Sequence, residues 1–540
     1  MNSFSRSFTV PVLVVLSLAL ITFGCGSSGG GGKGPGIPSI QVAKPAVDRP
    51  SGYFVDPIDV TISPGTAGTF GDTIVYTTDG SDPSCDAGPA YASTTVTINS
   101  VDVDGAVTTI KAVACMDSYD DSDVLVATYT ELVADTRVNS GAGLSPIQDA
   151  INAAATGDVI YIEPGTYTEN NGQVTINKRV TLIGAGRGDD PATNTIINSN
   201  APLGINPIHI STGGASATSR VAIRNLKVTG SLGKDGGGNG GGGIEIGTID
   251  GHIEFDNVAS VGNSGNGIHL NVSGSFTQDI VIRNSDLSFN GNHGFRNPSS
   301  VGYINGLLID NTTFEGNTGA GIMFYDAAAG AAGSPGFLIS NSTFNGNAAG
   351  VYQLGDIVFS GFNGNGTFST VSIVGNASES GIRISGNKDS GTNLSTGTAG
   401  NLTLSNVNIS GVQQSYGTYP SGAIIITRYL GLSNVTMSNV ELGSTAPNGL
   451  FLGTISAAGS TVSGPGLGPD LGDLLLSGTF SVADIKLGSH GNSGSYDLTD
   501  ITIDARGVTF QGALDNVDVE DRIYHWNDDT LLGLVVWTTP

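Results

Sequence analysis

The sequence predicts an all-β protein whose main body is a right-handed parallel β-helix, preceded by a small immunoglobulin-like β-sandwich. The composition favours this class. The 540 residues include 82 glycines, and only 13% are charged and 38% hydrophobic, which suits many short strands joined by tight turns. A repeat favours it too. After residue 220, an apolar residue, a polar residue and Asn recur about every 30 residues, as in a solenoid.

The net charge of −26 limits the partners that the chain can attract. A strongly acidic protein repels the phosphates of nucleic acid, so we predict no nucleic-acid partner. It also repels polyanionic polysaccharides unless a cation or a local basic patch intervenes. The sequence leaves the oligomeric state open.

The N-terminus has the pattern of an export signal. Residues 1–25 contain Arg6, then an apolar stretch over 8–23 that is too short for a membrane span, and end at Cys25. The ending resembles a bacterial lipobox, which implies acylation of Cys25 and a membrane anchor. Residues 26–39 read as a flexible Gly/Ser-rich tether. We therefore expect a lipoprotein of the cell envelope, at the outer membrane or cell surface, with secretion as the alternative.

Residues 40–132 predict an antiparallel β-sandwich, because short alternating runs are separated by turn residues. The segment YTTDGSDPS (76–84) resembles the signature of the chitobiase C-terminal-like domains. That resemblance implies a non-catalytic accessory module of the kind found beside carbohydrate-active and surface domains. The runs are IDVTIS (58–63), TIVYTT (73–78), TTVTIN (94–99), TTIKAVAC (108–115) and VLVATYT (124–130).

Cysteines and acidic residues in this segment raise two further questions. In an oxidising compartment Cys85 and Cys115 would form a disulfide, and the alternative is two buried free thiols. Clustered carboxylates would make a Ca²⁺ site possible, and the alternative is a solvated acidic loop, since their spacing does not match an EF-hand. No Cys/His spacing suits zinc, and we predict no definite metal site. The carboxylates are those of Asp79, Asp82, Asp117, Asp120, Asp121 and Asp123.

Residues 137–505 are predicted to form the β-helix, beginning with a capping helix over 145–155. Ser145 suits the N-cap, a proline follows it, and Gln148 would complete a capping box. A capping helix followed by short strands resembles the start of pectin lyase-like β-helix proteins. Residues 506–540 leave the repeat and are predicted to cap the C-terminal end.

A second resemblance concerns the turn after this helix. Gly165, Tyr167 and Glu169 form a G-x-Y-x-E pattern that is similar to the start of pectin methylesterases. In that family the pattern is a structural opening turn and not the active site.

The recurring asparagines should occupy one stacked corner of the coil. Rungs of a parallel coil stack about 4.8 Å apart, so residues with the same structural role recur at the same corner of every rung. Asn tolerates left-handed φ there, and its amide can bond the rungs above and below. A double gap in the series is assigned to a rung at 373–375. The corner residues are Asn225, Asn257, Asn284, Asn311, Asn341, Asn406 and Asn434.

A second column, after a glycine corner, carries the candidate chemistry. It reads Glu245, His269, Arg296, Met323, Tyr352 and Arg383, and alternation should point these side chains outward. A polysaccharide lyase needs a base, for which His269 or Glu245 would serve, and a cation for the enolate, for which Arg296 would serve. The other histidines, including His209 and His252, stand alone and are predicted to be structural or exposed. Further candidate ligand contacts are Tyr325, Asp326, Tyr352, Arg383 and Arg428.

The sequence leaves three functions open. The first is a surface protein whose β-helix binds extracellular polysaccharide or another cell-envelope partner. The second is a polysaccharide lyase or glycoside hydrolase that uses the Glu245–His269–Arg296 column. The third is a passive adhesion or structural element, because an exposed strand face carries polar residues in any case. The catalytic signatures of pectate lyases, polygalacturonases and pectin methylesterases are absent from the sequence.

Overall fold

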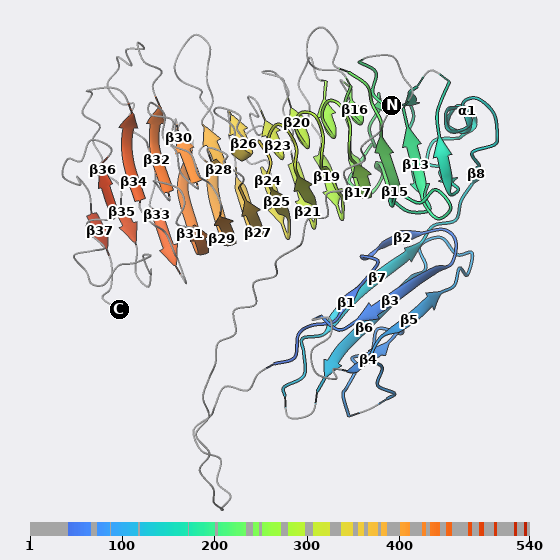
Figure 1. Ribbon diagram of the computed structural model, residues 1–540, viewed down its shortest axis with the longest axis horizontal. Helices are drawn as coiled ribbons and strands as arrows, with labels where there is room; N and C mark the ends of the chain where they lie inside the picture. Colours follow the sequence, from blue (N-terminus) through green and yellow to red (C-terminus); the bar gives the residue numbers. More distant parts are fainter. Residues whose placement is uncertain are drawn as a thin grey trace, which may run out of the picture.

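The computed structural model shows a long stack of short strands with a small sandwich beside its first rungs (Figure 1). It describes residues 41–536 except for 66–72, 87, 117–118, 171, 200–203, 234–240, 248–250, 272–278, 298–305, 325–335, 349–354, 361–364, 376–379, 386–399, 411–423, 428–431, 443–449, 456–473, 478–484, 491–501, 505–522 and 526–533. The predicted export signal, Cys25 and the tether lie outside the described residues. Among the described residues, none forms a helix long and apolar enough to cross a membrane.

The N-terminal unit is a two-layer sandwich, as predicted. One layer pairs β1, β3 and β5 antiparallel, and the other has the order β2-β7-β6-β4, in which only the β2–β7 pairing is parallel. Val60, Ile62, Ile74 and Ile110 are fully buried between the layers. The strands are β1 (Ala46–Val47), β2 (Gly52–Phe54), β3 (Ile58–Ser63), β4 (Thr73–Thr77), β5 (Thr94–Ile98), β6 (Val107–Cys115) and β7 (Leu125–Glu131).

The capping helix α1 (Pro146–Ala153) covers the first coil through buried Ile147 and Ile151. The predicted capping box is wrong, because the Ser145 side chain makes no cap hydrogen bond. Instead Glu169 Oε1 accepts the N–H of Ile147 at 3.0 Å. The Gln148 amide turns to the neighbouring strand, where its Oε1 accepts the N–H of Thr175 at 2.7 Å.

The opening turn has the structural role that its resemblance implied. The hydroxyl of Tyr167 donates to the carbonyls of Val138 and Glu163, at 3.0 and 2.8 Å. Glu169, two residues later, is buried against the helix start. The turn therefore fixes the helix on the first rung.

The body is a parallel β-helix built from two parallel sheets. We call them sheet I and sheet II. Sheet I comprises β11 (Val174–Ile176), β14 (Ile208–Ile210), β16 (Ile244–Ile246), β18 (Ile268–Leu270), β20 (Phe295–Asn297), β23 (Ile322–Phe324), β26 (Gly355–Ser360), β28 (Ser380–Ser385), β30 (Ile424–Thr427), β32 (Leu450–Ile455), β34 (Ile485–His490) and β36 (Ile523–His525).

Sheet II contains the longer strands, several of which turn a corner and pair with two strands of a neighbouring rung. Its last strand, Leu534–Val536, lies inside the segment predicted as a cap, and it adds one further rung by pairing in parallel with Thr502–Asp504. Sheet II comprises β8 (Thr136–Val138), β9 (Val159–Ile162), β10 (Gly165–Tyr167), β12 (Thr181–Gly184), β13 (Thr195–Asn198), β15 (Val221–Thr229), β17 (Ile253–Ser260), β19 (Asp279–Arg283), β21 (Gly306–Asp310), β22 (Thr313–Glu315), β24 (Phe337–Ser340), β25 (Thr343–Asn345), β27 (Gly366–Val374), β29 (Gly400–Ser410), β31 (Leu432–Leu442), β33 (Leu474–Ser477), β35 (Thr502–Asp504) and β37 (Leu534–Val536).

The predicted asparagine corner is present, except that strand register places Asn439, and not Asn434, beside Asn406. Asn225, Asn257, Asn284 and Asn311 have φ between 47° and 55°, which lies in the left-handed region. The amide of Asn257 donates to Asn225 Oδ1 at 3.0 Å. The double gap was misassigned: strand register places Thr370, with φ of 57°, at the missing corner instead of 373–375.

A second asparagine ladder runs inside the coil. Asn263, Asn290, Asn317 and Asn347 are all buried, and the amide of each donates to the oxygen of the next at 2.8–3.2 Å. Asp356 closes the series by accepting from Asn347 at 3.0 Å. Because the ladder satisfies its own polar groups, it can occupy the interior without the cost of unpaired amides.

The sandwich packs against sheet II at its first rungs (Figure 1). Val55 of the sandwich packs with Tyr161 and Ile183 of the β-helix in one buried apolar cluster. Around this cluster, Arg137 forms a two-bond ion pair with Asp56, at 2.7 and 3.1 Å. The two units therefore meet through both apolar and charged contacts.

Candidate ligand-binding strip

The predicted column forms a continuous line on the outer face of sheet I. Strand register aligns His209 with Glu245, Glu245 with His269, and His269 with Arg296. The flanking residues of each strand, such as Ile244 and Ile268, are fully buried, so alternation points the four polar side chains outward. We call these four residues the strip. His209 had been predicted to stand alone, but it is the first member.

The column continues beyond the strip with a different composition. Met323 follows Arg296, and Val358 follows Met323. Val358 then aligns with Arg383, as the column predicted. The rung assigned to Tyr352 is thus occupied by Val358, because the strand begins later than its glycine suggested. Tyr352 lies outside the described residues, as do Tyr325, Asp326 and Arg428.

Glu245 is held in place from three sides. Asn271 donates to Oε1 at 2.8 Å, Asn206 donates to Oε2, and His209 Nδ1 lies 3.5 Å from Oε1. Burial alone would raise the pKa of this carboxyl. Hydrogen bonds from His209 and Asn271 and the charges of His269 and His209 outweigh burial and lower the pKa to about 2.

The low pKa defines what Glu245 can do chemically. A general base works best when its pKa is near the working pH, and a carboxylate with a pKa of about 2 is a weak proton acceptor at neutral pH. The same carboxylate is a permanent hydrogen-bond acceptor. Glu245 is therefore suited to holding a neighbouring imidazole or a ligand hydroxyl and poorly suited to abstracting a proton.

His269 is more enclosed than the sequence predicted. Its side chain is only 3% exposed. A Cβ built on Gly242 would lie 3.1 Å from both His269 Nδ1 and Asn206 Oδ1, so the backbone at Gly242 covers the imidazole. His209, whose side chain is 27% exposed, is the more accessible of the two strip histidines.

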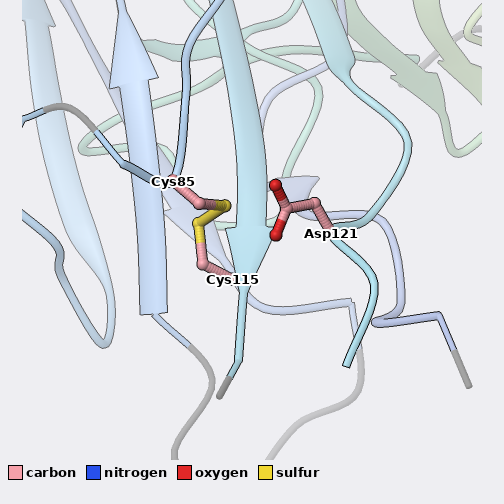
Figure 2. Close-up of side chains that lie close together, drawn as sticks. All are labelled: Cys85, Cys115 and Asp121. Atoms are coloured by element: carbon pink, nitrogen blue, oxygen red, sulfur yellow. A yellow bond between two sulfur atoms is a disulfide. The ribbon is translucent and has the colours of Figure 1, made fainter. Parts of the chain in front are cut away.

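The expected disulfide is present between Cys85 and Cys115, which are 5.7 Å apart at Cα (Figure 2). The carboxylate of Asp121 lies beside it, and the ligand atoms of these three residues are within 4.8 Å of one another. Sulfurs bonded to each other cannot act as thiolate ligands, so this group is not a metal centre in the oxidised protein.

Asp79, Asp82 and Asp123 of the predicted calcium set have other partners among the described residues. Asp79 accepts the N–H and hydroxyl of Ser81, and Asp82 pairs with Lys111 at 2.7 Å. Asp117 lies outside the described residues. Among the residues that the structure describes, no three carboxylates gather with oxygens within 4.8 Å, so the calcium alternative gains no support.

Comparison with known proteins identifies one part of the chain. No curated protein and no solved structure matches it. The assignment of the parallel β-helix therefore depends on the strand pairings and not on a relative. Residues 49–126, which contain most of the sandwich, match the family model of the chitobiase/beta-hexosaminidase C-terminal domain.

Proposed function

We propose that the chain is an exported, lipid-anchored surface protein whose β-helix binds extracellular polysaccharide along the outer face of sheet I. Cys25 would carry the lipid, and residues 26–39 would hold the folded part away from the membrane. The sandwich would act as an accessory module, in keeping with its match to a domain named after chitobiase and hexosaminidase.

The observation that carries the proposal is the alignment of His209, Glu245, His269 and Arg296 on successive rungs. Neighbouring strands are about 4.8 Å apart, so four rungs span about 14 Å, the length of a few sugar units. The line contains a carboxylate acceptor and three groups that can donate, which suits the hydroxyl groups of an extended sugar chain.

The ionised carboxylate of Glu245 and the burial of His269 favour binding over catalysis. Glu245 is a fixed carboxylate and His269 is covered, so neither is ready to take a proton from a polymer that lies on the surface. The accessible groups are His209 and Arg296, which can bind a sugar without any proton transfer.

Affinity electrophoresis through gels that contain single polysaccharides tests this function. We expect at least one polysaccharide to retard the wild type, and His209→Ala and Arg296→Gln to weaken retardation several-fold. Thr343→Ala is the matched control, because Thr343 is an exposed strand residue of the same coil on sheet II, whereas the strip lies on sheet I. Equal retardation of all four proteins would refute the strip as the binding face.

A polysaccharide lyase is the second candidate, because His269 and Arg296 are direct neighbours on adjacent strands. That pair places an imidazole beside a cation able to stabilise an enolate. Wild type and His269→Gln would be compared on uronate polymers for the ultraviolet absorbance of an unsaturated product. An absorbance that rises with wild type and not with the variant would favour the lyase, and no rise on any polymer would exclude it.

A further inference from the structure

A cleft of about 700 Å³ lies in the seam between the sandwich and sheet II, apart from the strip. One wall belongs to the sandwich and is formed by β2, by Ser51 just before it, and by β7, which contributes Thr128 and Thr130. The other wall belongs to the β-helix. It consists of Arg187, Asp256, Arg283, Asn284, Asp310 and Asn311.

Asp256, Arg283 and Asp310 of the β-helix wall form one column of sheet II. Each of them directly precedes an asparagine of the corner. Register aligns Asp256 with Arg283 and Arg283 with Asp310, so charges alternate along the cleft. The sandwich closes over this column through its backbone. Asn284 donates to the carbonyl of Ser51 at 3.1 Å, which fixes the two walls relative to each other.

The carboxylates of the cleft are already engaged. Asn284 donates to Asp256 Oδ1 at 2.7 Å, and Asp256 is only 3% exposed. Burial raises the pKa of this carboxyl, despite the hydrogen bond from Asn284. Asp310 Oδ1 accepts from the Ser340 hydroxyl at 2.6 Å and from the Asn341 amide at 2.8 Å.

The arginines of the cleft are not engaged in this way. Among the described residues, no carboxylate lies within 4.0 Å of the guanidinium of Arg187 or Arg283, and neither group has a hydrogen-bond partner. Burial lowers the pKa of Arg187, and the charge of Asp286 opposes this shift. Within the part of the chain that the structure describes, Asp286 acts on Arg187 and Asp256 acts on Arg283 only through longer-range charge, so the guanidinium donors of both arginines are available to a ligand.

We infer that the seam cleft binds an acidic sugar unit, with its carboxylate between Arg187 and Arg283. A guanidinium matches the planar geometry of a carboxylate and forms charge-assisted hydrogen bonds with it. Ring hydroxyls would meet the hydroxyls of Thr128 and Thr130 and the amide of Asn311. The inference does not depend on the strip, which lies on the other sheet.

Calorimetric titration of the full chain with hexamers of galacturonate, glucuronate and mannuronate tests the inference. Methyl-esterified galacturonate serves as the neutral probe. We expect at least one acid hexamer to bind, the ester to bind at least tenfold more weakly, and Arg187→Gln or Arg283→Gln to cost tenfold or more. Lys227→Gln is the matched control, because it removes a nearby positive charge that pairs outside the cleft with Asp189.

A second variant keeps the test decisive if the arginine variants fold poorly. Thr128→Trp would fill the cleft from the sandwich wall and should abolish binding without removing a charge. No binding by any acid hexamer, equal binding of acid and ester, or equal losses in Lys227→Gln and the arginine variants would each overturn the inference. Binding lost in His209→Ala and retained in Arg187→Gln and Arg283→Gln would refute the cleft and support the strip.

Discussion

Glu245 and His269 lie directly opposite each other on the adjacent parallel strands β16 and β18. The two groups differ in what they can contribute: the carboxylate is stabilised in its ionised form, and the imidazole is covered by the backbone at Gly242. Together with His209 on the preceding rung they form a fixed polar surface. This arrangement supports ligand binding more directly than proton transfer.

The depressed pKa of Glu245 predicts a pH-dependent contribution to stability. Its pKa falls from 4.5 in the unfolded chain to about 2 in the folded one, so the stabilisation is present above pH 4.5 and is lost as pH falls toward 2. The full difference corresponds to about 3 kcal/mol. Urea unfolding of wild type and Glu245→Gln at pH 7, 4.5 and 3 should show a gap that narrows below pH 4.5. A gap independent of pH would contradict the assignment.

The disulfide should stabilise the sandwich. It closes a loop of 30 residues, and loss of such a bond costs about 3.6 kcal/mol. Calorimetry of Cys85→Ser/Cys115→Ser should show a lower melting temperature for the sandwich transition and little change in the β-helix transition. An unchanged sandwich transition would mean that the bond contributes nothing.

The inner asparagine ladder should be essential to the coil. Asn290→Ala removes a donor to Asn317 and an acceptor for Asn263, which leaves buried groups unpaired at a cost of about 2–3 kcal/mol. Asn345→Ala is the control, since that amide lies exposed on β25 and, among the described residues, bonds Glu315 alone. Chemical denaturation of both variants measures the difference. Similar small losses would show that the ladder is dispensable.

The start of α1 offers a test of which residue caps it. Because Glu169 accepts the Ile147 N–H and the Ser145 hydroxyl does not cap the helix, Glu169→Ala should cost about 1 kcal/mol and Ser145→Ala much less. Equilibrium unfolding monitored by circular dichroism compares the two. A larger loss for Ser145→Ala would restore the capping box that the sequence suggested.

Much of the fold could be predicted from the sequence, because the coil repeats its corners. Asn225, Asn257 and Asn284 mark one corner through a residue type that tolerates left-handed φ. The prediction of the corner failed at the rung where a residue other than Asn adopts the left-handed φ. Thr370 holds the corner in the double gap, and β-branched residues give no sequence signal for it.

The candidate site was predicted in part. Alternation placed Glu245, His269 and Arg296 in one column, since rung spacing fixes which strand residues align. His209 was missed because its rung lacks the preceding glycine corner that marked the others. The seam cleft could not have been found, because it depends on how Ser51 of the sandwich meets Asn284 of the β-helix, 233 residues away.

Hydrogen–deuterium exchange with and without a polysaccharide that retards the protein tests whether the strip is the binding face. We expect protection of backbone amides in β14, β16, β18 and β20, whose strands carry the strip. Protection confined to other strands of the coil, with these four unchanged, would contradict it.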